Sequence, residues 1–83
     1  MCISLVAFAH MRTYCVVWEG GVNIRSGPSM HADRIGTREL GDRIETVLRA
    51  GNWLKIREIP GTIDCGWILM RSPKGTALLE LVA

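Results

Sequence analysis

The sequence predicts a small all-β domain, a barrel or sandwich built from short antiparallel strands. Turn-forming residues recur about every 8 to 12 residues, and the runs between them are short and often alternate apolar with polar residues. No long amphipathic helix, internal repeat or low-complexity segment interrupts this spacing. A chain of 83 residues accommodates one domain with a thin core.

The composition is that of a globular domain with little surplus charge. Hydrophobic residues make up 48% and charged residues 22% of the chain, which separates it from disordered sequences. The net charge is +2, and eight of the ten basic residues are Arg, scattered without forming a block. Nucleic-acid-binding surfaces more often show a clustered basic patch, so the charge pattern does not favour one.

Two strands are predicted before the first long loop. Residues 12–18 are rich in β-branched and aromatic side chains, which favours a strand. The segment Glu19-Gly20-Gly21 ends this strand with a turn or a bulge, because glycine interrupts strands. Val22–Arg25 then alternates apolar with polar residues, as a strand with one buried face does.

A surface loop is predicted over residues 26–33, with Met30 and His31 exposed. It begins with the corner Ser-Gly-Pro-Ser. Gly27 accepts dihedral angles that are barred to other residues, and Pro28 fixes its own φ, so both residues favour a turn here.

Two further strands follow this loop. Residues 34–40 form a weaker strand, in which Gly36 indicates a bulge or a close approach of two main chains. The dipeptide Gly41-Asp42 turns the chain, and residues 43–49 form a clear alternating strand.

Three strands complete the predicted sheet. The segment 50–52 is a short hairpin connection to a strand over residues 53–59. After a turn-rich excursion, residues 65–70 form a short apolar strand. Residues 76–82 favour helix by composition, but so short a helix is marginal, so a closing strand paired with residues 13–17 is preferred. The predicted core residues are Val22, Ile24, Ile44, Leu54, Ile56 and Ile68.

The domain is expected to span residues 12–83, after a poorly defined leader over residues 1–11. The first nine residues are apolar but lack a basic start and are shorter than a working signal peptide or a membrane span. They are interpreted as a leader, a translation remnant or an extra edge strand.

The three cysteines do not predict a metal or redox site. No pair among Cys2, Cys15 and Cys65 has the spacing of a zinc knuckle or a redox dithiol. Cys15 and Cys65 are interpreted as small buried residues on strands, with a disulfide between them as an open alternative. No cofactor is predicted.

Several short motifs together resemble the bacterial-type Src homology 3 (SH3b-like) domain over roughly residues 14–69. They occur in the family's order: Val22-Asn23-Ile24-Arg25-Ser26-Gly27-Pro28-Ser29, Ile35-Gly36, Leu40-Gly41-Asp42, Asn52-Trp53-Leu54-Lys55-Ile56 and Gly66-Trp67-Ile68. The resemblance implies a small Src homology 3-like barrel of five to six short antiparallel strands without catalytic residues. It also implies a targeting or ligand-binding module, and some members bind cell-wall peptides. Proline-rich ligands are not implied, because Tyr14 and Trp18 do not form the eukaryotic alanine-leucine-tyrosine-aspartate-tyrosine motif.

Five residues are candidates for ligand contact: Trp18, Arg25, Trp53, Lys55 and Arg57. Arg25 has a structural interpretation, pairing with Glu39 or Glu45, and a functional one, binding a ligand carboxylate. Trp53 either covers the core or shares an open face with Lys55 and Arg57, where it could stack on a peptide or a sugar. Trp18, beside the two glycines, is expected to be partly exposed. The site is expected to be a shallow surface near Trp18, Trp53 and the loop over residues 26–33, with a mixed aromatic and basic lining that suits an acidic or amphipathic peptide.

The sequence therefore favours a non-enzymatic module that recognises a peptide or protein segment, such as a cell-wall peptide. No nucleophile motif, paired acid and base or phosphate-binding loop is present. A structural or spacer domain that docks within a larger protein is the main alternative. A nucleic-acid-binding small barrel is a weaker one, because it requires the arginines to converge on one face.

Overall fold

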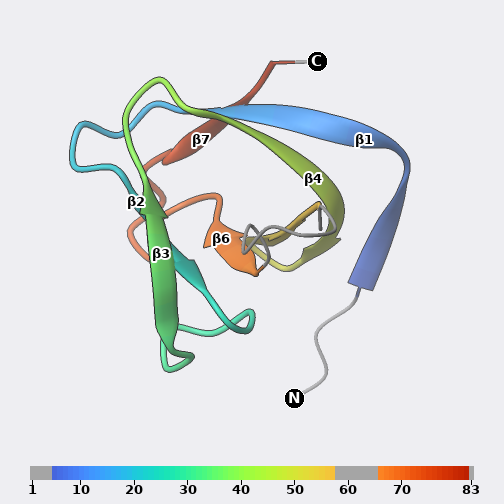
Figure 1. The fold of residues 1–83 in the computed structure, drawn as a ribbon, viewed down its shortest axis with the longest axis horizontal. Coiled ribbons are helices and arrows are strands. Elements are labelled where there is room, and N and C mark those ends of the chain that lie inside the picture. Colours follow the sequence, from blue (N-terminus) through green and yellow to red (C-terminus); the bar gives the residue numbers. More distant parts are fainter. Residues whose placement is uncertain (1–4, 58–65, 83) are drawn as a thin grey trace.

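Seven antiparallel strands form one curled sheet in the computed structural model, which describes residues 5–57 and 66–82 (Figure 1). The strands are β1 (Leu5–Val16), β2 (Val22–Arg25), β3 (Arg34–Arg38), β4 (Arg43–Ala50), β5 (Trp53–Ile56), β6 (Trp67–Leu69) and β7 (Leu79–Leu81). The all-β class is confirmed, and each run that was expected to be a strand overlaps one. The family resemblance implied five or six strands, and the described residues form seven.

The sheet order is β3-β2-β6-β5-β4-β1-β7. In Figure 1 the sheet curls so that β2 and β3 stand along one side while β1 and β4 arch away from them. Strands β5 and β6 link these two parts, because β6 pairs with β2 and β5 pairs with β4. The short central strands therefore carry the connection between the two halves of the curled sheet.

The core lies inside this curl, and all six residues predicted for it are buried there. A row across three strands joins Ile24 to Ile68 and Ile68 to Leu54, and these side chains are at most 3% exposed. Burying an aliphatic side chain of this size contributes about 1.5–3 kcal/mol relative to leaving it exposed. The sequence reasoning missed four further members of the core: Tyr14, Val16, Met70 and Leu79.

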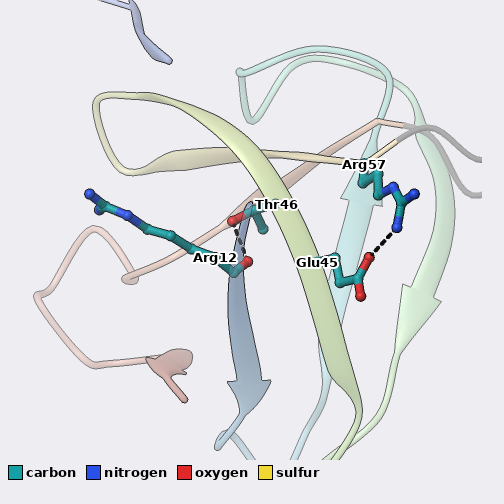
Figure 2. A network of polar contacts seen from close by, with 4 residues as sticks. All are labelled: Arg12, Glu45, Thr46 and Arg57. Atoms are coloured by element: carbon teal, nitrogen blue, oxygen red, sulfur yellow. Dashed lines mark hydrogen bonds and ion pairs between the residues drawn. The ribbon is translucent and has the colours of Figure 1, made fainter. Parts of the chain in front are cut away.

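Strand β1 is longer than the predicted strand, because it begins at Leu5 instead of residue 12 and ends at Val16. Its pairing with β4 is interrupted between Ala7 and Arg12, and Figure 1 shows a sharp bend in this strand. The Thr46 hydroxyl donates a 2.9 Å hydrogen bond to the Arg12 carbonyl where regular pairing resumes (Figure 2). Because Thr46 is fully buried, this bond gives its hydroxyl the partner that a buried polar group needs.

A bulge in β4 lies beside the same residue. Thr46 pairs with Ile56 and Leu48 pairs with Lys55, so Val47 is an extra residue in the ladder. Bulges increase the local twist and bend of a strand. The irregularities in β1 and β4 thus occur side by side and help the sheet to curl.

The predicted closing strand is confirmed as β7. Its residues pair with the end of β1 through Tyr14↔Leu81, Cys15↔Glu80 and Val16↔Leu79. Leu79 is buried, whereas Glu80 and Leu81 are exposed. Tertiary pairing therefore prevails over the helix-favouring composition of this segment.

The loop after β2 contains the predicted turn, but the turn is formed for a different reason than expected. Gly27 does not adopt a positive φ, so the expectation of a special glycine conformation is wrong there. Hydrogen bonds shape the loop instead: Ser26 N–H donates to the Asp33 carbonyl, and Ala32 N–H donates to the Ser29 carbonyl. Both predicted exposed residues, Met30 and His31, are exposed.

The predicted bulge at Gly36 is confirmed. Ile24 pairs with Gly36 and Arg25 pairs with Arg34, which leaves Ile35 as the extra residue of β3. The hairpin between β4 and β5 is also confirmed, with Gly51 at φ 61° in its two-residue loop. Glycine at this first loop position is typical of type II′ hairpin turns.

Candidate binding cleft

Alternation along the strands places one set of residues on the outer face of β2, β6 and β5. Because Ile24, Ile68 and Leu54 point into the core, their strand neighbours point the other way. The register forms a row in which Trp67 pairs with both Arg25 and Lys55, and a second row in which Trp53 pairs with Leu69. This outer face therefore combines two tryptophans with two basic residues.

A cleft of about 210 Å³ lies on this face, and we call it the aromatic cleft. Strand residues form its floor, and side chains from three loops form its walls. It is lined by Trp18, Gly21, Val22, Asn23, Arg25, Met30, Trp53, Leu69, Ser72, Pro73 and Leu78. Of the five predicted ligand-contacting residues, Trp18, Arg25 and Trp53 meet here.

Trp18 stands at the wall of the cleft and is 46% exposed, as expected for a residue beside the glycine turn. The turn is closed by a 2.9 Å hydrogen bond from Gly21 N–H to the Trp18 carbonyl. Gly21 has a φ of 73°, and a Cβ atom on it would lie 2.6 Å from the Arg38 carbonyl oxygen. Glycine is thus required at this position both by conformation and by the close approach of β3.

The indole of Trp18 also lies against Gly20. A Cβ atom on Gly20 would stand 2.9 Å from the indole Nε1, closer than such atoms approach without a shift. The absence of a side chain at Gly20 therefore lets Trp18 occupy its place at the wall of the cleft.

Arg25 is half-buried, and its Nη1 donates a 3.0 Å hydrogen bond to the Ala32 carbonyl in the loop after β2. The predicted pairing with Glu39 or Glu45 is wrong, since the Arg25 side chain bonds the Ala32 carbonyl and Glu45 is paired with Arg57. This hydrogen bond orients the guanidinium. Because a guanidinium has five N–H donors, others are left for a ligand.

Trp53 forms part of the floor and is 9% exposed. It shares the outer face with Lys55 but is largely buried beside the loop residues that line the aromatic cleft. The alternative of Trp53 as an open platform beside Lys55 and Arg57 is therefore wrong, and its exposed contribution is confined to the cleft. Lys55 lies in the neighbouring row and does not line the aromatic cleft.

Arg57 lies in a different depression, of about 580 Å³, together with Arg38 and Arg43. Its guanidinium forms a 2.8 Å ion pair with the carboxylate of Glu45, and both side chains are close to half exposed (Figure 2). The adjoining depression also contains Glu39 and Asp42, so acidic and basic side chains are interleaved on this surface. Arg57 is thus separated from the other predicted contact residues.

Sequence reasoning missed most of the apolar lining: Met30, Leu69, Pro73 and Leu78. Strand alternation with Trp67 was a usable signal for Leu69, because both point outward from β6. Met30 was predicted to be exposed in the loop over residues 26–33, which was expected to border the site, but Met30 itself was not named as a contact residue. For Pro73 and Leu78 the local sequence carries no signal, since their position depends on how the chain returns after β6.

The described residues contain no group of three or more His, Cys, Asp or Glu side chains that could hold a metal ion. Cys15 is a free, half-buried thiol in β1. Cys2 and Cys65 lie outside the described residues, and so does the proposed pairing with Cys65.

In a comparison with protein families, the model described as "Bacterial SH3 domain" matches residues 20–74. This is more than half of the chain. The chain belongs to the bacterial SH3 domain family. Domains of the SH3 type are generally non-catalytic modules that bind peptides or proteins, so the match indicates a protein-binding module. Searches of curated proteins and of solved structures returned no significant match.

The family match covers most of the aromatic cleft of this bacterial SH3 domain but not all of it. Trp18 precedes the matched residues and Leu78 follows them. None of the described residues belongs to a helix of the length and hydropathy needed to cross a membrane.

Proposed function

We propose that this bacterial SH3 domain is a non-enzymatic module that binds a peptide or protein segment in its aromatic cleft. The observation that carries the proposal is the meeting of Trp18, Trp53 and Arg25 around one small, mostly apolar space. Rigid aromatic side chains supply contact area at low entropic cost, and an arginine adds directional hydrogen bonds. Cell-wall peptides are the narrower ligand class to test first.

The cleft is suited to a ligand because its walls come from separate parts of the chain that are each held in place. The Trp18 wall is closed by the turn hydrogen bond to Gly21, and the Arg25 side chain is held by Ala32. Leu78 is fixed by its N–H bond to the Met70 carbonyl. A preformed site loses less entropy on binding than one that must be ordered first.

A titration of the ¹⁵N-labelled chain with muropeptides and short synthetic peptides tests the proposal. Shifts of backbone amides along the cleft and of the indole N–H groups of Trp18 and Trp53 are expected. Trp18→Ala should weaken binding, whereas Arg43→Gln, which changes the other depression, should not. Shifts confined to the depression that contains Arg43 would contradict the site, and the absence of shifts with every ligand would contradict the function.

A structural or spacer role remains a second candidate, favoured by exposed apolar residues near the first and last described residues of the chain. Leu5 and Val6 in β1 are 67% and 53% exposed, and Leu81 in β7 is 57% exposed. Such residues suit docking against another part of a longer protein. If the first proposal holds, the double variant Leu5→Ser/Leu81→Ser should bind peptides as the natural chain does. If the natural chain binds no peptide, the spacer role is favoured.

A nucleic-acid-binding role receives less support from the surface charges. Arg38, Arg43 and Arg57 converge, as such a role requires, but Glu39, Asp42 and Glu45 lie in the same two depressions. Interleaved carboxylates oppose the approach of a polyanion. A salt-sensitive electrophoretic shift with DNA or RNA would reverse this conclusion.

A further inference from the structure

We infer that the aromatic cleft selects a ligand segment in which one apolar side chain lies next to a carboxylate group. This inference rests on the proposed function, because it names the chemistry of the ligand that the same cleft takes. It follows from the size of the cleft, its lining and its single charge.

The size of the cleft limits what it can hold. Its volume of about 210 Å³ is below the range of about 300–1,000 Å³ that is usual for small-molecule pockets. A single bulky side chain with its adjoining main chain fits this space, whereas a long segment cannot enter it.

The lining favours an apolar side chain. Trp18 and Met30 are 46% and 51% exposed at its walls, and Trp53 and Leu69 form a paired floor. Exposed aromatic and methionine side chains around a small hollow gain most from burying an apolar group, since water leaves both surfaces. A fully polar ligand would leave these side chains in contact with its polar atoms and gain little.

The lining of the cleft carries one charge, and it is positive. Arg25 is the one ionised side chain among the described residues that line the cleft, and none of these residues is acidic. The Ala32 carbonyl holds one N–H of the guanidinium, so the remaining donors keep a fixed direction. A carboxylate accepts two parallel N–H bonds from a guanidinium, which a neutral amide cannot do.

Binding of matched short ligands to the ¹⁵N-labelled full chain tests this inference. N-acetyl-glycyl-leucine carries both groups, and N-acetyl-glycyl-leucinamide lacks the carboxylate. N-acetyl-glutamyl-leucinamide places the carboxylate on a side chain, with N-acetyl-glutaminyl-leucinamide as its neutral match. N-acetyl-glutamyl-glycinamide retains the carboxylate but lacks the apolar side chain.

Loss of the carboxylate is expected to weaken binding at the cleft roughly tenfold in at least one of the two matched pairs, as one charge-assisted hydrogen bond implies. Loss of the leucine side chain is expected to weaken it by a similar factor. The pair with the larger difference identifies whether a chain terminus or an acidic side chain supplies the carboxylate.

Equal affinity for the acid and the amide in both pairs would overturn the inference while leaving the cleft as a peptide site. Equal affinity for the glycine and leucine ligands would overturn it as well. If no ligand in this set and no muropeptide shifts the cleft residues, the proposed function fails with it.

Variants localise the effect to Arg25. Arg25→Gln should abolish the preference for the acid over the amide while leaving the amide affinity nearly unchanged. Arg43→Gln removes a positive charge outside the aromatic cleft and should retain the full preference. A preference that survives in Arg25→Gln would contradict the assignment to Arg25. The ligand comparison uses the natural chain, so it holds even if Arg25→Gln folds poorly.

Discussion

The main chain at Gly66 passes so close to Arg25 that a Cβ atom on Gly66 would lie 2.7 Å from the Arg25 carbonyl oxygen. Gly66 also has a φ of 121°, a conformation that other residues rarely adopt. This contact joins the start of β6 to the end of β2, directly beneath the outer face that carries Arg25. The glycine of the Gly-Trp-Ile motif is therefore needed for the pairing that builds the cleft floor.

Gly66→Ala is expected to destabilise the domain by more than about 3 kcal/mol, because strain adds to a clash with main chain that cannot move aside. Gly75→Ala is the matched control. Gly75 has a φ of 89° and no atom within 4 Å of an added Cβ, so strain alone should cost about 1–2 kcal/mol. Urea unfolding of both variants measures the difference, and equal losses would contradict the close contact.

Thr46→Val is expected to lower the free energy of unfolding by about 1–2 kcal/mol. The substitution removes the hydroxyl that bonds the Arg12 carbonyl at the bend of β1 and leaves that carbonyl without this donor. Thr37→Val is the control, since Thr37 is exposed on the edge strand β3. Urea unfolding should show little change for the control, and a neutral Thr46→Val would mean that the bend does not depend on this bond.

The Glu45–Arg57 ion pair is expected to contribute little to stability despite its short distance. Both side chains are close to half exposed, and exposed pairs typically give about 0.2–1 kcal/mol in double-mutant cycles. A cycle with Glu45→Gln and Arg57→Gln measures the coupling, which should vanish in 1 M salt. A coupling well above 1 kcal/mol that resists salt would contradict this expectation.

Gly20→Ala is expected to displace Trp18 with little loss of stability. Gly20 does not have a positive φ, and the atom that an added Cβ would meet belongs to a side chain that can move. The indole N–H resonance of Trp18 should shift, and ligand affinity should fall several-fold. At Gly27 an added Cβ meets its nearest atom, in Ala32, at 3.7 Å, so Gly27→Ala serves as the control and should change neither reading.

Leu79→Ala is expected to cost about 2–4 kcal/mol, because Leu79 is buried in the core where β7 closes against β1. Leu81→Ala, two residues later on the same strand, should be nearly neutral, since Leu81 is 57% exposed. Thermal or urea unfolding distinguishes the two. Similar effects for both variants would indicate that β7 is not a packed part of the domain.

The core was predictable because strand alternation is a local property of the sequence. Ile44 and Ile24 could be assigned to the core from their immediate neighbours, without knowledge of the partner strands. The start of β1 could not be assigned in this way. Residues 5–9 form a continuous apolar run without alternation, and both Leu5 and Val6 are exposed.

The cleft was only partly predictable because its parts meet through tertiary contacts. Trp18 and Trp53 stood out by residue type, and Arg25 by its strand position. The hydrogen-bond partner of Arg25 could not be predicted, because it is the main-chain carbonyl of Ala32. Every residue has such a carbonyl, so residue type does not show which one the folded loop brings to Arg25. Strand alternation alone would place Lys55 and Arg57 on the same face as Trp53. However, β5 ends at Ile56, and Arg57 lies at the other depression.

The hydrogen bond from Val17 N–H to the Leu78 carbonyl, 3.0 Å long, ties together the two ends of the chain that frame the aromatic cleft. Trp18 and Leu78 both lie outside the part of the sequence that the family shares. If the cleft binds ligand as proposed, substitutions at these two positions would alter ligand recognition without changing the motifs that the family match covers. A shortened protein cut to the family boundaries would keep the matched motifs but lose two walls of the cleft together with strands β1 and β7.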